Sequence, residues 1–560
     1  MTLSPQAFDQ IAIWLASSID ESMKHELRKA LDSDPSSLEN AFYTSLSFGT
    51  GGMRGLMGIG TNRMNISTVG MATQALVNYI RKVEARKKHS VVIGYDSRNY
   101  SFEFAQECAR VIAGAGFTAY LFDGLRPAPM ISFACRFYHA TSAIMITASH
   151  NPPQYNGYKV YWADGGQVLP PHDTGIMKEY HAIKGPDEVV RAPLSSPLIQ
   201  LINIDKQYLD ALPPPLQPEC LKKSDLKVLY SNLHGAGGTV MQEALERIGI
   251  TNFSFVHEQR ALDGKFPTTT SPNPEEEASL QLGKERLLSE KYDLFIATDP
   301  DADRLGSVCR VGEAAHTLNG NEIFTLMTEY VLRILSTQNK MPKGPVVIKS
   351  IVTTPLIDAI CKKYGVVLLE VLPGFKYFVE KINAWEKVPG SPHFVLGGEE
   401  AYGTLYGTHT RDKDAIVAAR LLVEIAAAAK ESSSTLYNEL KRIWKEYGVY
   451  KERLINHGFP ETKEGREAMK LLMESFRANP LQPFAGQKVV ASQDLLKTGS
   501  DLPRSDVLIY TLENEGRVIV RPSGTEPKVK IYIMTREDTE QACDARLSQL
   551  EQDIRKRLQL

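Results

Sequence analysis

The chain has 560 residues, which corresponds to three or four domains of ~150 residues each. Hydrophobic residues make up 43% and charged residues 23%, proportions typical of folded globular proteins, so extensive disorder is excluded. The 64 Lys and Arg and the 66 Asp and Glu residues give a formal net charge of −2. The basic excess that usually marks a nucleic-acid-binding protein is missing, and we expect no nucleic-acid partner.

The sequence also argues against membrane association and secretion. No apolar run approaches the ~18 residues that a membrane-spanning helix needs, and the N-terminus lacks the basic leader of a signal peptide. The six cysteines are scattered and no two form a CxxC pair, so neither a disulfide framework nor a zinc site is expected. We therefore expect a cytoplasmic protein with reduced thiols.

Short apolar runs alternate with helix-like segments through most of the chain. The first strands are predicted at 90–96, 118–122 and 143–147, with a helix at 102–115. Further buried strands are predicted at 226–229, 294–297, 346–349, 366–371 and 394–396. This alternation predicts βαβ units on mixed, mostly parallel sheets, which is an α/β fold.

Composition changes suggest where the domains meet. A Pro-rich segment at 213–218, the stretch 312–320 and a change of character after Tyr447 are candidate junctions. The last ~100 residues run helix, strand, loop, strand, helix, which is closer to an α+β domain. We therefore predict three similar α/β domains followed by a C-terminal α+β domain.

The loop 147–152 reads Thr-Ala-Ser-His-Asn-Pro and follows the predicted strand 143–146. Open α/β sheets place their chemistry at the carboxyl ends of strands. Ser149, held on a tight turn there, could be a nucleophile or a phosphate carrier. The alternative is a polar turn that caps a helix. His150 next to it does not by itself make a catalytic pair, and no G-x-S-x-G motif surrounds Ser149.

The loop 298–304 reads Thr-Asp-Pro-Asp-Ala-Asp-Arg and also follows a predicted strand. Asp299, Asp301 and Asp303 can converge on one hard cation, and oxygen ligands favour magnesium or calcium over zinc. The spacing of an EF-hand is absent. A solvated acidic turn is the alternative, although three close like charges repel unless a cation or strong donors hold them. Arg304 is then a candidate phosphate partner beside the metal.

The third motif is Gly-Gly-Glu-Glu-Ala-Tyr-Gly at 397–403, directly after the predicted strand 394–396. Adjacent Glu399 and Glu400 between glycines can accept hydrogen bonds from hydroxyl groups, and sugar hydroxyls are the natural candidates. An ordinary exposed turn would have a similar composition. This motif alone therefore leaves both readings open.

The fourth motif is Arg-Pro-Ser-Gly-Thr-Glu-Pro-Lys at 521–528, between predicted strands at 518–520 and 529–534. Two cations, two hydroxyls and flexible backbone amides make a good phosphate-binding loop. The Walker spacing is missing, so this is not a P-loop. The alternative is a basic turn without a ligand.

Taken in this order, TASHNP, DPDADR and RPSGTEP resemble the α-D-phosphohexomutase family, which includes phosphoglucomutase and phosphomannomutase. The resemblance runs from the segment 48–55 (Phe-Gly-Thr-Gly-Gly-Met-Arg-Gly) to the loop 521–528. The loop 397–403 and the Asp-Lys-Asp-Ala at 412–415 are most similar to the branch with phosphopentomutase and glucose-1,6-bisphosphate synthase. The resemblance implies four domains around a central cleft.

The resemblance also assigns a role to each predicted domain. These are a phosphoserine-bearing α/β domain (1–205), a metal-binding α/β domain (206–316), a sugar-binding α/β domain (317–450) and a phosphate-binding α+β domain (451–560). Ser149 would be the phosphoserine, and one Mg²⁺ would be held by Asp299, Asp301, Asp303 and a phosphoserine oxygen of residue 149. The catalytic set would include Lys159 as candidate general acid or base, Arg54 and Arg304. Glu399 would bind sugar hydroxyls, Lys413 would lie near the phosphosugar, and the phosphate not being transferred would be held by Arg521, Ser523, Gly524, Thr525 and Lys528.

The resemblance implies an intramolecular phosphotransferase that interconverts hexose 1-phosphate and hexose 6-phosphate, with glucose as the expected sugar. Phospho-Ser149 would form a 1,6-bisphosphate that turns end over end, with glucose 1,6-bisphosphate as activator and a monomer or homodimer as the active form. The alternatives are a phosphomannomutase, a phosphopentomutase, a glucose-1,6-bisphosphate synthase and an inactive sugar-phosphate sensor. Ala401 and Pro373 stand where many relatives have Ser and Thr, so the sequence leaves the sugar open.

Overall fold

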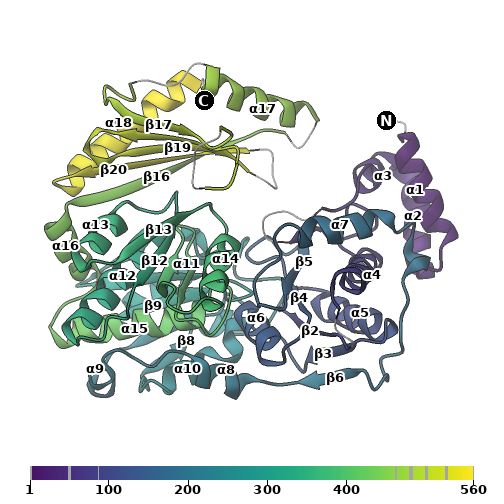
Figure 1. The fold of residues 1–560 in the computed structure, drawn as a ribbon, viewed down its shortest axis with the longest axis horizontal. Helices are drawn as coiled ribbons and strands as arrows, with labels where there is room; N and C mark the ends of the chain where they lie inside the picture. The colour runs from purple at the N-terminus through teal and green to yellow at the C-terminus, as the bar shows by residue number, and fades with distance from the viewer. Residues whose placement is uncertain are drawn as a thin grey trace.

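The computed structural model describes residues 3–47, 52–85, 88–460, 463–478, 483–497, 502–523 and 528–558. The described strands form four sheets, with six, five, four and five strands in chain order. In Figure 1 the first sheet lies to the right, the second and third lie together at the left, and the C-terminal sheet lies above them. None of the described helices is long and apolar enough to cross a bilayer.

The first sheet has the order β1-β5-β4-β2-β3-β6. Its strands are β1 (Met53–Leu56), β2 (Ser90–Tyr95), β3 (Thr118–Phe122), β4 (Ser142–Ile146), β5 (Tyr155–Trp162) and β6 (Ile199–Ile202). The pairs among β4, β2, β3 and β6 are parallel, whereas β5 runs antiparallel to both β4 and β1. The sheet is therefore parallel over most of its width, with an antiparallel edge.

Helices cover both faces of this sheet. They are α4 (Ile66–Val83), α5 (Ser101–Gly114), α6 (Ala128–Phe137) and α7 (His172–Ala182), preceded by α1 (Pro5–Ala16), α2 (Glu21–Ser33) and α3 (Pro35–Phe42). Val91 and Ile93 of β2 share a core cluster with α4 and α5, whereas Val92 between them packs in the cluster that contains α6. A strand buried on both faces reads as a continuous apolar run, which is why β2 could be recognised in the sequence.

The second and third sheets are also mixed, in the orders β11-β10-β9-β7-β8 and β13-β12-β14-β15. The second has β7 (Val228–Ser231), β8 (Phe253–Phe255), β9 (Leu294–Thr298), β10 (Leu305–Val311) and β11 (Ala314–Leu318). The third has β12 (Pro345–Ser350), β13 (Val367–Val371), β14 (His393–Gly398) and β15 (Thr404–Tyr406). The helices of this region are α8 (Asp205–Ala211), α9 (Pro218–Lys223), α10 (Met241–Glu246), α11 (Glu277–Ser289), α12 (Gly320–Thr337), α13 (Leu356–Tyr364), α14 (Phe375–Glu386), α15 (Ala415–Glu431) and α16 (Leu436–Tyr447).

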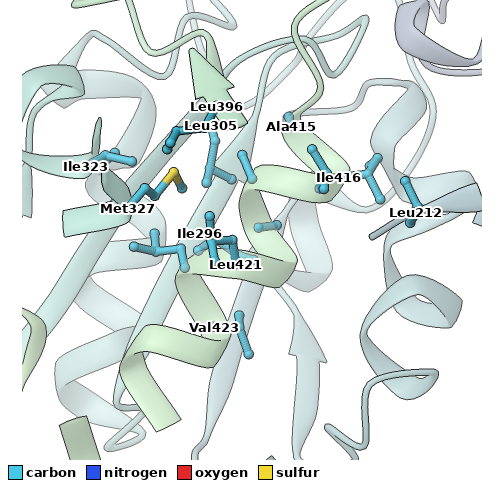
Figure 2. Close-up of a cluster of buried hydrophobic side chains, with 14 of the residues drawn as sticks. Leu212, Ile296, Leu305, Ile323, Met327, Leu396, Ala415, Ile416, Leu421 and Val423 are labelled. Carbon is cyan, nitrogen blue, oxygen red and sulfur yellow. The ribbon is translucent and has the colours of Figure 1, made fainter. Parts of the chain in front are cut away.

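One hydrophobic cluster joins the second and third sheets. Ile416 and Leu421 of α15 pack with Ile296 of β9, Leu305 of β10 and Leu396 of β14 (Figure 2). Because α15 follows the segment 411–414 and β9 precedes the acidic loop, this shared core fixes the two loops relative to each other.

The C-terminal sheet is antiparallel throughout its described strands, in the order β16-β20-β19-β18-β17. It contains β16 (Val449–Gly458), β17 (Val489–Asp494), β18 (Leu508–Leu512), β19 (Arg517–Pro522) and β20 (Lys528–Glu537), with helices α17 (Lys463–Ala478) and α18 (Glu540–Leu558). The prediction of three α/β domains followed by an α+β domain is confirmed by this arrangement.

Two of the predicted domain boundaries cut through strands. The junction at 316/317 falls inside β11, and the one at 450/451 falls inside β16. A boundary inside a paired strand would divide one sheet between two domains. We therefore propose junctions after Leu318 and before Val449 instead.

Candidate active site

Ser149 lies on the turn that follows β4, at the carboxyl end of the strand as predicted. Its backbone is left-handed, with φ of 53°, and its amide donates to Thr147 Oγ1 at 2.8 Å. The buried hydroxyl donates to Asp299 Oδ2 at 2.9 Å, which joins the serine loop of the first domain to the acidic loop of the second. The turn thus places the Ser149 hydroxyl oxygen next to the Asp299 carboxylate.

His150 also contacts this oxygen, since its Nδ1 lies 3.2 Å from Ser149 Oγ. Burial, and then the neighbouring Arg304 and Arg54 charges, lower the pKa of His150 well below its usual value. The imidazole is therefore neutral near pH 7. Sequence adjacency alone did not predict this contact, because the left-handed turn at Ser149 decides where the two side chains point.

The acidic loop between β9 and β10 brings its three carboxylates together. One oxygen from each of Asp299, Asp301 and Asp303 lies within 4.8 Å of the others, and all three side chains are buried. Asp299 Oδ1 accepts the amides of Asp303 and Arg304 at 3.1 and 3.0 Å, which folds the loop back on itself. The loop is tied to both neighbouring domains, because Ala128 donates to the Asp301 carbonyl and Ala415 donates to that of Ala302.

The donor set of this loop fits Mg²⁺. Among the described residues, Asp301 Oδ1 and Asp303 Oδ1 are buried without a hydrogen-bond partner. Burial, and then the charges of Asp301 and Asp303, raise the pKa of Asp299 well above its usual value. Closely spaced, buried carboxylate oxygens with unused lone pairs suit a hard divalent cation, which would remove this repulsion.

Two lysines contact the acidic loop from neighbouring domains. Lys159 Nζ on β5 lies 2.7 Å from Asp301 Oδ2 and 3.1 Å from Asp303 Oδ2, and Lys413 Nζ lies 3.1 Å from Asp303 Oδ2. Burial lowers the pKa of Lys159, but the two aspartates outweigh it and hold that pKa above its usual value. Lys159 is therefore an ammonium ion here, and it donates hydrogen bonds to the carboxylates of the acidic loop.

Two arginines complete the cationic surroundings. Arg54 on β1 donates from Nη1 to Asn151 Oδ1 at 3.2 Å, and its buried Nε has no hydrogen-bond partner among the described residues. Arg304 forms an ion pair with Glu275, and its Nε lies 3.8 Å from Asp303 Oδ1. Arg304, the predicted phosphate partner, is thus already paired with Glu275, which the sequence did not single out.

The loop 397–403, called the sugar loop below because Glu399 is predicted to bind sugar hydroxyls, contacts the loop that precedes α14. Glu399 Oε1 accepts the amide of Gly374 at 2.7 Å, and Gly374 has φ of 120°, a conformation that favours glycine. Glu400 turns the other way and accepts from Ser350 Oγ at 3.0 Å, while burial and then the Glu399 charge raise its pKa to about 7. Of the two glutamates, Glu399 is therefore anchored to the residue that follows Pro373, in the loop before α14.

The C-terminal basic loop is partly described. Gly524 and Thr525 lie outside the described residues, and Ser523 donates its amide to the Lys528 carbonyl at 2.7 Å. Arg521 Cζ lies 5.9 Å from the ring centroid of Tyr532, and its buried Nε has no hydrogen-bond partner among the described residues. Its guanidinium keeps donor capacity for a ligand.

Lys530 joins this basic group, although the sequence analysis omitted it. It pairs with Arg521 across β19 and β20, and alternation along β20 places it on the face of Lys528 and Tyr532. Burial, and then Arg521 and Lys528, lower its pKa, whereas Glu275 and Glu400 act in the opposite direction. The alternating spacing Lys528-Val-Lys530-Ile-Tyr532 was the signal in the sequence that could have identified Lys530.

Comparison with known proteins assigns this chain to a class. Four profiles described as phosphoglucomutase/phosphomannomutase alpha/beta/alpha domains I, II and III and C-terminal domain match residues 45–186, 206–312, 319–444 and 485–551. These are domains of intramolecular phosphotransferases. The chain belongs to the phosphoglucomutase/phosphomannomutase family, as its resemblance to the α-D-phosphohexomutases predicted.

Curated relatives match over nearly their whole length. A phosphoglucomutase of Staphylococcus haemolyticus is 34% identical over 534 residues, covering 92% of this chain and 94% of the relative. A phosphoglucomutase of Staphylococcus epidermidis is 35% identical over 512 residues, covering 88% and 90%. The match therefore includes all four domains.

Solved structures share the fold. A putative phosphomannomutase from Thermus thermophilus superposes with a TM-score of 0.69 at 22% identity, covering 92% of this chain and all of that one. The open form of parafusin, a phosphoglucomutase from Paramecium, superposes with a TM-score of 0.68 at 18% identity, covering 91% and 95%. At these identities the likeness concerns architecture alone.

Proposed function

We propose that this hexose phosphate mutase acts on glucose phosphates and carries the transferred phosphoryl group on Ser149. The observation that carries the proposal is the contact of Ser149 Oγ with Asp299, a member of the acidic triad. The names of the staphylococcal relatives support glucose as the sugar. We further propose one Mg²⁺ per chain, glucose 1,6-bisphosphate as activator and a cytoplasmic monomer or homodimer.

Charge balance explains why so many cations surround the serine. The three aspartates and one Mg²⁺ sum to −1, and a phosphoserine would add about −1.5 to −2. Bound Mg²⁺, held by the triad and a phosphoserine oxygen, would draw charge from the phosphoryl oxygens in the transition state. Arg54, Lys159 and Arg304 supply the remaining positive charge, which a second phosphate dianion requires before it can approach.

Phosphoryl transfer depends on positioning and electrostatic stabilisation more than on covalent chemistry by the protein. The bond between phosphorus and Ser149 Oγ breaks as a bond to a sugar hydroxyl oxygen forms. The departing Oγ needs a proton and the attacking hydroxyl loses one. Lys159, an ammonium ion in contact with the triad, is our candidate for relaying this proton: it gives one to Oγ and takes the one that the hydroxyl loses, and in the reverse direction it does the opposite.

A mutase must also hold the phosphate that is not reacting. We assign this role to Arg521, Ser523, Gly524, Thr525 and Lys528, with Lys530 added because it pairs with Arg521 across the strands. Glu399 would accept hydrogen bonds from sugar hydroxyls, with Lys413 beside it. The bisphosphate intermediate would turn end over end, so that each of its two phosphates lies once at Ser149 and once at the basic loop. Water must be excluded meanwhile, or hydrolysis would compete.

A substrate panel tests the sugar assignment. Glucose, mannose, glucosamine and ribose 1-phosphates are each assayed with a trace of glucose 1,6-bisphosphate, and formation of the isomeric phosphate is measured. We expect the highest kcat/KM for glucose 1-phosphate, at least ~10-fold above ribose 1-phosphate, since a pentose lacks one hydroxyl for Glu399 and paired polar groups discriminate strongly. The highest value with ribose would instead identify a phosphopentomutase.

Two further outcomes would contradict the mutase assignment. Fast formation of bisphosphate from 1,3-bisphosphoglycerate with slow isomerisation would identify a bisphosphate synthase. Binding of hexose phosphates without turnover of any sugar would identify a sensor.

Pro373 does not prevent ordering of the sugar loop, because Glu399 takes its hydrogen bond from the next residue, Gly374.

Replacing Arg521 with Ala tests the distal phosphate site. A hydrogen bond to a charged group is worth about 1.5–3 kcal/mol, so we expect KM for glucose 1-phosphate to rise ~10- to 100-fold. Arg453→Ala is the matched control, because Arg453 lies on β16 of the same sheet and pairs with Glu551. An unchanged KM in Arg521→Ala, with KM of the control also unchanged, would remove the basic loop from substrate binding.

A further inference from the structure

Arg98 is a buried cation behind the serine loop that neither the motifs nor the proposed mechanism has used. It follows β2 in the segment Asp96-Ser97-Arg98, and its side chain is fully buried. Such a side chain is expensive to bury unless nearly every donor is occupied and its charge is paired. Its contacts therefore indicate what it stabilises.

The guanidinium of Arg98 binds the backbone of the serine loop. Nη2 donates to the Ser149 carbonyl at 2.5 Å and to the Asn151 carbonyl, and Nη1 donates to the Pro152 and Tyr155 carbonyls at 3.0 Å each. One side chain thus gathers four carbonyl oxygens from a seven-residue segment. The planar fork of an arginine can do this, whereas a lysine ammonium has three donors at a single point.

The same side chain is fixed from the first and second domains. Its Nε lies 3.4 Å from Asp96 Oδ2, and its Cζ lies 5.1 Å from the ring centroid of Phe266. Backbone packing is equally close there, because a Cβ on Gly264 would lie 2.3 Å from the Asn99 amide nitrogen. Arg98 therefore links the serine loop to the second domain, which also carries the acidic triad.

The conformation of Ser149 explains why such a clamp is needed. A left-handed backbone at a residue other than glycine costs on the order of 1–3 kcal/mol and persists only where the surroundings impose it. The Ser149 carbonyl, which would be free to rotate in an isolated turn, is held by Nη2 of Arg98. We propose that Arg98 is a positioning residue that keeps Ser149 Oγ aligned with Asp299, and this inference rests on the proposed role of Ser149.

The test replaces Arg98 with Lys, which keeps the charge and removes most of the carbonyl contacts. Because a misplacement of about 1 Å can cost ~10²-fold in rate, we expect kcat to fall ~100-fold per folded molecule while KM for glucose 1-phosphate changes less than ~3-fold. Arg191→Lys is the matched control, because Arg191 pairs with the buried Glu107 in the same domain. Its kcat should match that of the unmodified protein.

Rescue separates positioning from general destabilisation. In Arg98→Ala, guanidinium ion at millimolar concentration should restore part of kcat, whereas ethylammonium at equal concentration should not. The fraction of folded protein is followed by circular dichroism throughout. Phe266→Leu, which removes the aromatic ring next to Arg98 and leaves the carbonyl hydrogen bonds of Arg98 in place, should lower kcat less than Arg98→Lys does.

The outcomes distinguish this inference from the proposed function. A folded Arg98→Lys variant with kcat within ~3-fold of the unmodified protein overturns the positioning role. The role is also overturned if activity falls only in proportion to the fraction of folded protein and guanidinium does not restore it. If Ser149→Ala keeps its activity, the proposed function itself fails. If Ser149→Ala is inactive and Arg98→Lys is fully active, only the positioning role fails.

Discussion

Ser149→Ala should reduce mutase turnover by at least ~10⁴-fold in a protein that stays folded. The substitution removes the one oxygen that we propose as phosphoryl carrier, and uncatalysed phosphate monoester cleavage is too slow to replace it. In the unphosphorylated protein the lost contacts are those with Asp299 Oδ2 and His150 Nδ1, and the loss costs about 1–3 kcal/mol of folding free energy for each buried partner left unpaired. Turnover is measured with glucose 1-phosphate, and phosphorylation by mass spectrometry after incubation with glucose 1,6-bisphosphate.

Ser142→Ala is the matched control for this experiment. Ser142 lies on β4, the strand that leads into the serine loop, and its buried hydroxyl donates to the Tyr161 carbonyl at 2.6 Å. Both variants thus lose one buried hydroxyl from the same region. We expect Ser142→Ala to retain activity and phosphorylation. Activity of Ser149→Ala within ~10-fold of the control would mean that the phosphoryl group travels by another route.

The sequence could predict the strands that are apolar along nearly their whole length. β2, β4 and β9 are buried on both faces, and their apolar runs ended within one or two residues of the predicted limits. β5 was missed because its sequence, Tyr-Asn-Gly-Tyr-Lys-Val-Tyr-Trp, alternates apolar and polar residues irregularly. Its place is decided by pairing with β4 and β1, a tertiary contact that no local pattern encodes.

The candidate site divides in the same way. Ser149 and the triad could be predicted because each follows a recognisable strand, and the carboxyl ends of strands are where α/β sheets carry their sites. The structure brings Ser149, Lys159 and Lys413 to the triad from the first and third domains. The contacts of Arg304 with Glu275 and of Arg98 with the Ser149 carbonyl depend on how distant segments pack. No residue spacing in the sequence therefore predicted them.

Asp301→Asn should weaken the response of the protein to magnesium. Asp301 Oδ2 is taken by Lys159 and Oδ1 is buried with no partner among the described residues, so the amide removes a charged ligand without changing the size of the side chain. We expect the magnesium concentration for half-maximal activity to rise ~10- to 100-fold. Exchange of a charged for a neutral ligand removes one charge-assisted contact, which is worth about 1.5–3 kcal/mol.

A readout independent of activity is the stabilisation of the folded protein by the metal. A ligand at 100 times its Kd raises the free energy of unfolding by about 2.7 kcal/mol, so Mg²⁺ should raise the Tm of the unmodified protein and raise that of Asp301→Asn much less. Asp293→Asn is the control, since Asp293 precedes β9 at the end opposite the triad and pairs with Lys430 and Arg310. That variant makes the same change of charge, so its response to Mg²⁺ should be intact even if its Tm is lower. An equal Mg²⁺-induced rise in Tm for Asp301→Asn and the unmodified protein would place the metal elsewhere, because the buried triad could not lose a charged ligand without a change in its affinity.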